Sequence, residues 1–171
     1  LRKFLKIYNI ELGPYTYIGA GFGPSLTSTP ITADLVIADD GDDSGDASDG
    51  IGGSKYDACQ TLSNRFANNG KIAHIEREDC PFVDKVRNAQ QAGAIAVVVM
   101  YRNDGSQENW NSAPITRGGS NEEDIAIPSV MISATDGTIH VSNTIDAADD
   151  AFRVIVARHR DRTTQLLTIS A

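Results

Sequence analysis

Two cysteines, Cys59 and Cys80, are the residues of this chain best suited to covalent chemistry. Cys80 stands where a helix is expected to begin, and a free thiol there would have a lowered pKa and could act as a nucleophile. A disulfide between the two would instead close a loop of about 20 residues and stabilise the fold by roughly 3 kcal/mol. The pair is even in number, close in sequence and without a Cys-x-x-Cys motif, so we predict the disulfide. An oxidising compartment follows, which places the chain among secreted or cell-surface proteins.

A second candidate site is the acidic segment DDGDDSGDASDGIGGSKYD, residues 39–57, which has too few apolar residues to form a core and is predicted to be a surface loop. Its start follows the D-x-D-x-S-G pattern of a calcium loop. The last position of an EF-hand loop falls on Ile51, where a bidentate glutamate belongs, so the sequence does not favour a true EF-hand. Two interpretations stay open: a solvated acidic loop that needs no cofactor, and a different kind of Ca²⁺ site. The candidate calcium ligands are Asp40, Asp42, Ser44 and Asp46.

Catalytic motifs are missing from the sequence. It contains neither H-E-x-x-H nor G-x-S-x-G, and no P-loop. The histidines are His74, His140 and His159, and we interpret His74 as an exposed or hydrogen-bonded residue on a strand. The carboxylates gather in loops, whereas acid–base catalysis needs pKa values tuned by burial. We therefore predict a chain that is not an enzyme.

A long polar segment, residues 102–126, surrounds the only tryptophan, Trp110. Loops of this length within compact domains are usually functional or disordered. Trp110 either folds back as a local anchor or contacts a partner, because aromatic residues dominate binding surfaces. The candidate peptide-binding residues are Arg102, Asn103, Asp104, Trp110 and Asn111.

The element that must position these groups is a strand–helix–strand unit at residues 71–101. Residues 71–77 alternate apolar and polar side chains and predict a strand. Cys80 and Pro81 open a helix, with the proline at its first position, and Gly93 ends it. Residues 94–100 form an apolar run typical of a strand covered on both faces, as in a parallel pair. Five polar residues of the helix are assigned to its solvent face: Asp84, Lys85, Arg87, Asn88 and Gln91.

Further elements are expected on either side of this unit. Strands are predicted within residues 1–9, 14–23, 34–38, 127–132, 152–157 and 166–169, and a helix within 133–148. Residues 24–32 are predicted to be a loop.

Length and composition support one domain spanning residues 1–171, because 171 residues with 40% hydrophobic content can bury a core. The net charge of −8 and the pI near 4.7 argue against nucleic acid as a partner. No apolar run is long enough to span a bilayer. The sequence begins LRKFLKIYNI, without an initiator methionine or a signal-peptide pattern, so we expect a piece excised from a larger protein.

Residues 70–100, together with IPSVMIS at 127–133, resemble the protease-associated (PA) domain family. The matching residues are Gly70, Lys71, Ile72 and Ala73; Ile75, Arg77, Asp79, Cys80 and Phe82; Lys85, Val86, Asn88, Ala89, Gln90, Ala92, Gly93 and Ala94; Val97, Val98 and Val99; and Ile127, Pro128 and Ser129. The segment from Asp49 and Gly50 to Cys59 also looks like the family's loop and its half of the disulfide. The acidic insert at 39–49 is longer than the family pattern leads us to expect.

The resemblance implies an α/β fold, a small, partly closed β-barrel or sandwich with flanking helices. Such domains occur in secreted and membrane peptidases, both subtilisin-like and zinc-dependent, and in sorting receptors. They are regarded as non-catalytic, share no catalytic residues, and bind protein or peptide or gate substrate access.

The first functional hypothesis is therefore a non-catalytic module of a secreted peptidase that binds a peptide, a protein substrate or the peptidase domain of the same polypeptide. In this hypothesis the 102–126 segment is the contact surface, and a peptide is held there by strand addition or in a groove. The alternatives are a calcium-stabilised structural spacer and an independent hydrolase.

Overall fold

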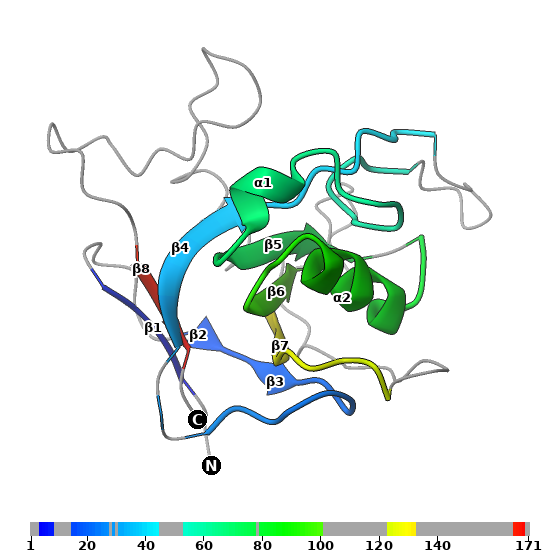
Figure 1. Cartoon of the computed structure of the whole chain (residues 1–171). Helices are drawn as coiled ribbons and strands as arrows, with labels where there is room; N and C mark the ends of the chain where they lie inside the picture. The colour runs from blue at the N-terminus through cyan, green and yellow to red at the C-terminus, as the bar shows by residue number, and fades with distance from the viewer. Residues whose placement is uncertain are drawn as a thin grey trace, which may run out of the picture.

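A computed structural model describes residues 4–8, 15–27, 29, 31–44, 53–77, 79–100, 123–132 and 166–169, and it shows a mixed α/β fold (Figure 1). Within these residues the elements, in chain order, are β1 (Phe4–Tyr8), β2 (Tyr15–Thr16), β3 (Ile18–Gly19), β4 (Ile31–Ile37), α1 (Arg65–Asn68), β5 (Ile72–Glu76), α2 (Phe82–Gln91), β6 (Ala96–Met100), β7 (Ser129–Ile132) and β8 (Leu166–Ile169). None of the described helices is long and apolar enough to cross a membrane.

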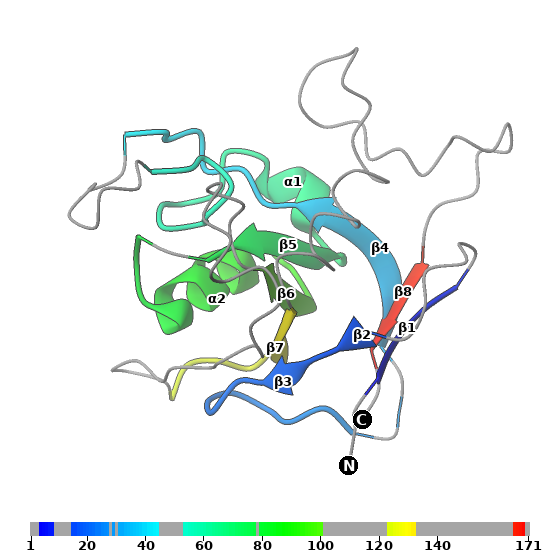
Figure 2. The same ribbon diagram turned by 180° about the vertical axis from the view of Figure 1, so that it is seen from behind.

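The strands form one sheet in the order β2-β1-β8-β4-β5-β6-β7-β3. The two strands at its ends, β2 and β3, are separated along the chain only by Tyr17. The short segment 15–19 therefore joins both edges, and the sheet curls into a small, partly closed barrel (Figure 2). This confirms the predicted fold class.

The central β5–α2–β6 unit is also confirmed. β5 pairs parallel with β6, from Ile72 opposite Ala96 to Glu76 opposite Met100. Gly93 has a φ of +86°, the left-handed conformation expected after the helix. One detail differs from the prediction. Pro81 has an extended backbone (ψ 142°) and is the N-cap of α2, so the helix begins one residue later than predicted, at Phe82.

Apolar side chains fill both faces of the sheet. One core lies between α2 and the sheet and contains Ala73, Ile75, Val83, Val86, Ala89, Val97 and Val99. The other lines the barrel interior and contains Tyr17, Leu35, Ile72, Val98, Met100, Val130 and Ile132. His74 was interpreted as exposed or hydrogen-bonded, and the structure shows that it is not exposed: the residues of β5 from Ile72 to Ile75 are all buried, His74 among them. The barrel covers the face of β5 that carries His74.

Other elements differ from the prediction in where they begin and end, or were not predicted at all. β4 starts at Ile31, inside the segment predicted to be a loop, because residues 31–34 pair with β8. Helix α1 was not predicted, since four residues are too few for a helical period to show. The predicted helix at 133–148 and strand at 152–157 lie outside the described residues.

Candidate interaction site

The parallel strands β4, β5, β6 and β7 end along one edge of the sheet, which we call the carboxyl edge. Their last residues are Ile37, Glu76, Met100 and Ile132. Ligands of open α/β sheets bind outside the carboxyl ends of the strands, where the following loops converge. Four segments of this chain start from that edge, so it is the first place to look for a functional surface.

The predicted peptide-binding segment follows β6 directly, since Arg102 comes two residues after Met100. Arg102, Asn103, Asp104, Trp110 and Asn111 themselves lie outside the described residues. Their role in peptide binding stays a prediction.

The acidic loop, residues 38–44, continues from β4 at the same edge. Its carboxylates bind the chain's own backbone: Asp39 Oδ1 accepts the Gly41 N–H at 2.7 Å, and Asp42 Oδ1 accepts the Ser44 N–H at 2.8 Å. Asp40 accepts the N–H groups of Asp42 at 3.0 Å and of Gln60 at 3.1 Å. The bonds between residues two apart form successive turns, and the bond from Gln60 ties the acidic loop to the segment after Cys59.

Hydrogen bonding and burial shift the two carboxyl pKa values in opposite directions. Burial raises the pKa of Asp40 above its ordinary value; the backbone N–H groups of Asp42 and Gln60 counteract this rise, and the nearby Asp57 carboxyl adds to it. The Ser44 hydroxyl and then the Ser44 N–H lower the pKa of Asp42.

Of the four candidate calcium ligands, the structure therefore brings Asp40, Asp42 and Ser44 into one loop, and Asp46 lies outside the described residues. Within the described ranges, no group of three or more His, Cys, Asp or Glu side chains is arranged to hold a metal ion. Calcium binding by this loop stays a prediction.

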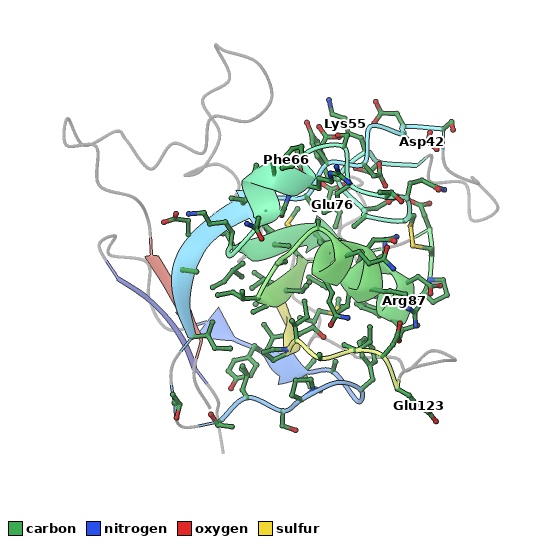
Figure 3. All side chains as sticks on the ribbon, in the orientation of Figure 1. Asp42, Lys55, Phe66, Glu76, Arg87 and Glu123 are labelled. Atoms are coloured by element: carbon green, nitrogen blue, oxygen red, sulfur yellow. A yellow bond between two sulfur atoms is a disulfide. The ribbon has the colours of Figure 1, made fainter. Side chains whose placement is uncertain are left out.

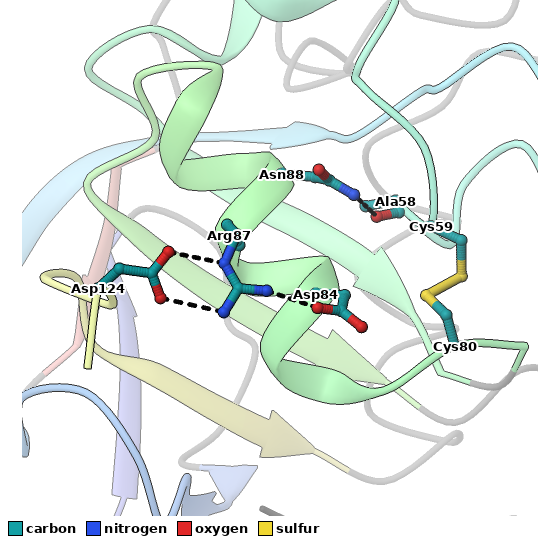
Figure 4. Close-up of polar contacts among 7 residues, drawn as sticks. All are labelled: Ala58, Cys59, Cys80, Asp84, Arg87, Asn88 and Asp124. Atoms are coloured by element: carbon teal, nitrogen blue, oxygen red, sulfur yellow. Dashed lines mark hydrogen bonds and ion pairs between the residues drawn. A yellow bond between two sulfur atoms is a disulfide. The ribbon is translucent and has the colours of Figure 1, made fainter. Parts of the chain in front are cut away.

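A second loop at the carboxyl edge, residues 53–60, carries the predicted disulfide, which is present between Cys59 and Cys80 with Cα atoms 5.7 Å apart (Figure 4). Helix α2 holds this loop at two further points. Asn88 Nδ2 donates to Ala58 O at 2.9 Å, and Lys85 Nζ donates to Asp57 O at 2.7 Å and to Cys59 Sγ at 3.2 Å.

The placement of Lys85 corrects the sequence analysis, which assigned it to the solvent face of α2. Its side chain is 0% exposed. The loop 53–60 covers that side of the helix, and the backbone carbonyl of Asp57 and the Cys59 sulfur replace water around the amine. The helical period alone cannot show that a loop distant in the sequence buries a polar residue such as Lys85.

The end of β5 is bound to the 53–60 loop. Ser54 Oγ donates to Glu76 Oε2 at 2.6 Å, and the Glu76 N–H donates to Tyr56 O at 2.9 Å. Asn64 bonds the end of β4 from the start of α1: its Nδ2 donates to Ile37 O at 2.8 Å. Hydrogen bonds thus hold the loops of the carboxyl edge to the strand ends and to α1 and α2.

One apolar side chain interrupts this polar edge. Phe66 is 84% exposed on α1 (Figure 3), and the start of this helix lies beside the acidic loop, where the Ser63 and Asn64 N–H groups donate to Asp39 O. The Arg65 guanidinium lies 4.9 Å from the centre of its ring. Sequence analysis missed Phe66, because the segment showed no helical period from which to place it.

The one histidine in the described part of the chain lies away from solvent. His74 is 1% exposed in the barrel interior, and its neighbours in the paired strands are Ile37 and Val98. His140 and His159 lie outside the described residues.

Comparison with known proteins gives the chain its family. The PA domain model matches residues 31–139. The ER degradation-enhancing alpha-mannosidase-like protein 3 of Xenopus laevis is 36% identical over 87 residues, which is 49% of this chain and 9% of that protein. The PRADC1-like protein of Drosophila melanogaster is 28% identical over 132 residues, 77% of this chain and 57% of that protein.

A solved structure shows the same fold in a larger enzyme. A zinc aminopeptidase from Bacillus subtilis superposes with a TM-score of 0.58 at 19% identity, covering 98% of this chain and 30% of the aminopeptidase. The family match spans β4 to β7 and includes the whole carboxyl edge. The chain belongs to the PA domain family.

Proposed function

We propose that this chain is a non-catalytic interaction module of a larger protein of the secretory pathway, and that its carboxyl edge contacts a peptide, a protein substrate or the catalytic domain of the same polypeptide. The relatives support a module that accompanies catalytic domains, because the chain spans 9% of the mannosidase-like protein and 30% of the aminopeptidase. The disulfide supports an oxidising compartment.

The observation that carries the proposal is the exposed Phe66 on a carboxyl edge whose loops are otherwise polar and tied down. An aromatic side chain that is 84% exposed loses a large apolar area from water when a partner covers it. The surrounding framework is held by a disulfide and by hydrogen bonds from α2 and β5, so little conformational entropy is lost on binding. The 102–126 segment that starts from the same edge would supply the variable contacts, with Trp110 as its aromatic anchor.

The test uses two probes: a tryptic digest of casein as a peptide mixture, and the domain encoded next to this one as a purified protein. We expect the chain to retain at least one of them, and Phe66→Ala and Trp110→Ala each to weaken retention roughly tenfold, which is typical of an aromatic contact. Ile95→Ala is the matched control, because Ile95 is 37% exposed at the opposite end of the sheet, just before β6. Wild-type chain that retains neither probe, or an Ile95→Ala effect equal to that of Phe66→Ala, would contradict the proposal.

The alternative proposal is a calcium-stabilised spacer built on Asp40, Asp42, Ser44 and Asp46. Closely spaced carboxylates in one loop support it, because Ca²⁺ takes six to eight oxygen ligands. The backbone hydrogen bonds already made by Asp40 and Asp42 make it the weaker of the two.

A further inference from the structure

The disulfide has unlike surroundings at its two sulfurs. Cys59 Sγ accepts a hydrogen bond from Lys85 Nζ at 3.2 Å, and that amine is completely buried. Cys80 precedes Pro81, the N-cap of α2, and so lies outside the first turn of the helix that the sequence predicted it to open. A lysine amine next to a cysteine lowers the pKa of the thiol, whereas the effect of a helix N-terminus falls off outside the first turn. Of the two possible thiolates, the one on Cys59 is therefore the better stabilised.

This asymmetry decides how the bond would break. In thiol–disulfide exchange a thiolate attacks one sulfur and expels the other, and the thiol of lower pKa leaves faster. Attack on Cys80 expels Cys59 next to the Lys85 amine, whereas attack on Cys59 would expel Cys80, which lies before α2 and away from that hydrogen bond. Both cysteines are half-buried residues, and neither belongs to the two apolar cores.

We propose that Cys59–Cys80 is a directional thiol–disulfide exchange site, in which an external thiol forms a mixed disulfide with Cys80 and Cys59 leaves as a thiolate held by Lys85. The attacking thiol first loses its proton to water. Its sulfur then bonds to Cys80 Sγ, the Cys59–Cys80 bond breaks, and the electron pair stays on Cys59 Sγ. A second thiol attacks the external sulfur of the mixed disulfide, and Cys80 leaves and takes up a proton. The net reaction oxidises two external thiols to a disulfide and reduces the protein bond.

Opening this bond would not release the loop, because other contacts keep it in place. Asn88 binds Ala58 O at 2.9 Å, Lys85 binds Asp57 O at 2.7 Å, and the Glu76 N–H binds Tyr56 O at 2.9 Å. The two cysteines therefore stay near each other after reduction and can form the bond again. Reversibility is what separates an exchange site from a bond whose loss simply unfolds the protein.

The source of the thiol can be a small molecule or a protein dithiol, and the test has an arm for each. Wild-type chain is incubated with glutathione in one arm, and in the other with a thioredoxin whose second active-site cysteine is replaced by serine. Free thiols are then blocked with N-ethylmaleimide, and the modified peptides are mapped by mass spectrometry. We expect the external thiol on Cys80 and the maleimide on Cys59, in at least a tenfold excess over the reverse pattern. An excess in one arm only identifies the source and supports the proposal.

Two variants separate the role of Lys85 from simple loosening of the loop. Lys85→Met keeps the volume of the side chain but removes the donor, and should slow mixed-disulfide formation by roughly threefold to tenfold and abolish the preference for Cys80. Asn88→Ala removes a loop contact without touching either sulfur, and should keep the preference. Mixed disulfides mainly on Cys59, an even split in the wild type, or no modification in either arm would overturn the proposal. If Lys85→Met does not fold, the position of the mixed disulfide in the wild-type chain still tests the proposal.

Discussion

Arg87 donates two hydrogen bonds to the Asp124 carboxylate, from Nε to Oδ2 at 2.7 Å and from Nη2 to Oδ1 at 3.0 Å (Figure 4). The pair ties α2 to the segment that leads into β7, and Gln90 repeats the connection by donating to Asp124 O and accepting from the Ala126 N–H. Helix α2 is thus tied to the segment before β7 by this pair, and the disulfide ties the residue two positions before α2 to the 53–60 loop.

Asp124→Asn should lower the melting temperature by no more than about 3 °C, because the pair is partly solvated and such pairs contribute little. Hydrogen bonding by Arg87 lowers the pKa of Asp124 below 3.8, so its stabilisation is present at higher pH and is lost as pH falls through the folded value. Thermal melts at pH 7 and pH 2.5 check this: the difference in melting temperature between wild type and variant should be smaller at the lower pH. The neighbouring Glu123→Gln is the control and should melt like the wild type at pH 7.

The central strand–helix–strand unit was predictable because its signals are local. The apolar stripe of α2, the apolar run of β6 and Gly93 after the helix all lie within about one crossover length of each other. The closure of the barrel was not predictable from the sequence. It depends on β2 pairing with β1 and on β3 pairing with β7, and β7 lies more than 100 residues after β3 along the chain.

The same limit applied to the candidate site. Cys59 and Cys80 could be paired from their number and spacing, but the burial of Lys85 and His74 depends on which segments cover them. A polar residue on a helix or strand predicts a solvent face only until a loop or a curved sheet lies over it.

Gly93→Ala should destabilise the fold by more than about 1 kcal/mol. Its φ of +86° suits glycine, and a Cβ there would collide with the Asn69 side chain. Gly21→Ala is the matched control, because no atom lies within 4 Å of the added Cβ. Urea unfolding of both variants measures the difference, and equal midpoints would contradict the account of the helix end.

Replacing both cysteines, Cys59→Ala with Cys80→Ala, should destabilise the protein by about 3 kcal/mol and lower its melting temperature by roughly 6–12 °C. The far-UV circular dichroism spectrum should stay unchanged, since Asn88 and Lys85 still hold the loop. A variant with the spectrum of an unfolded chain at 25 °C would show that these contacts cannot replace the bond.

Calcium should leave the melting curve unchanged, because the carboxylates of Asp40 and Asp42 are already bonded to backbone N–H groups. Melts in EDTA and in millimolar Ca²⁺ give the answer directly. A rise with Ca²⁺ that Asp42→Asn and Asp46→Asn each remove would instead favour the spacer function.

Asp40 should titrate above 3.8 in the folded protein, mainly because it is buried and partly because Asp57 lies close by. A folded pKa above the unfolded one favours the protonated carboxyl, so this contribution to stability is fully present below 3.8 and is lost as pH rises through the folded value. Asp57→Asn should lower the pKa of Asp40 only part of the way back, since burial, the larger cause, remains. The carboxyl ¹³C chemical shift of Asp40, followed by NMR from pH 2 to 8, measures both values, with Asp43→Asn as the control. A pKa of Asp40 that does not move in Asp57→Asn would show that the two carboxyls are independent, and burial alone would then account for the shift.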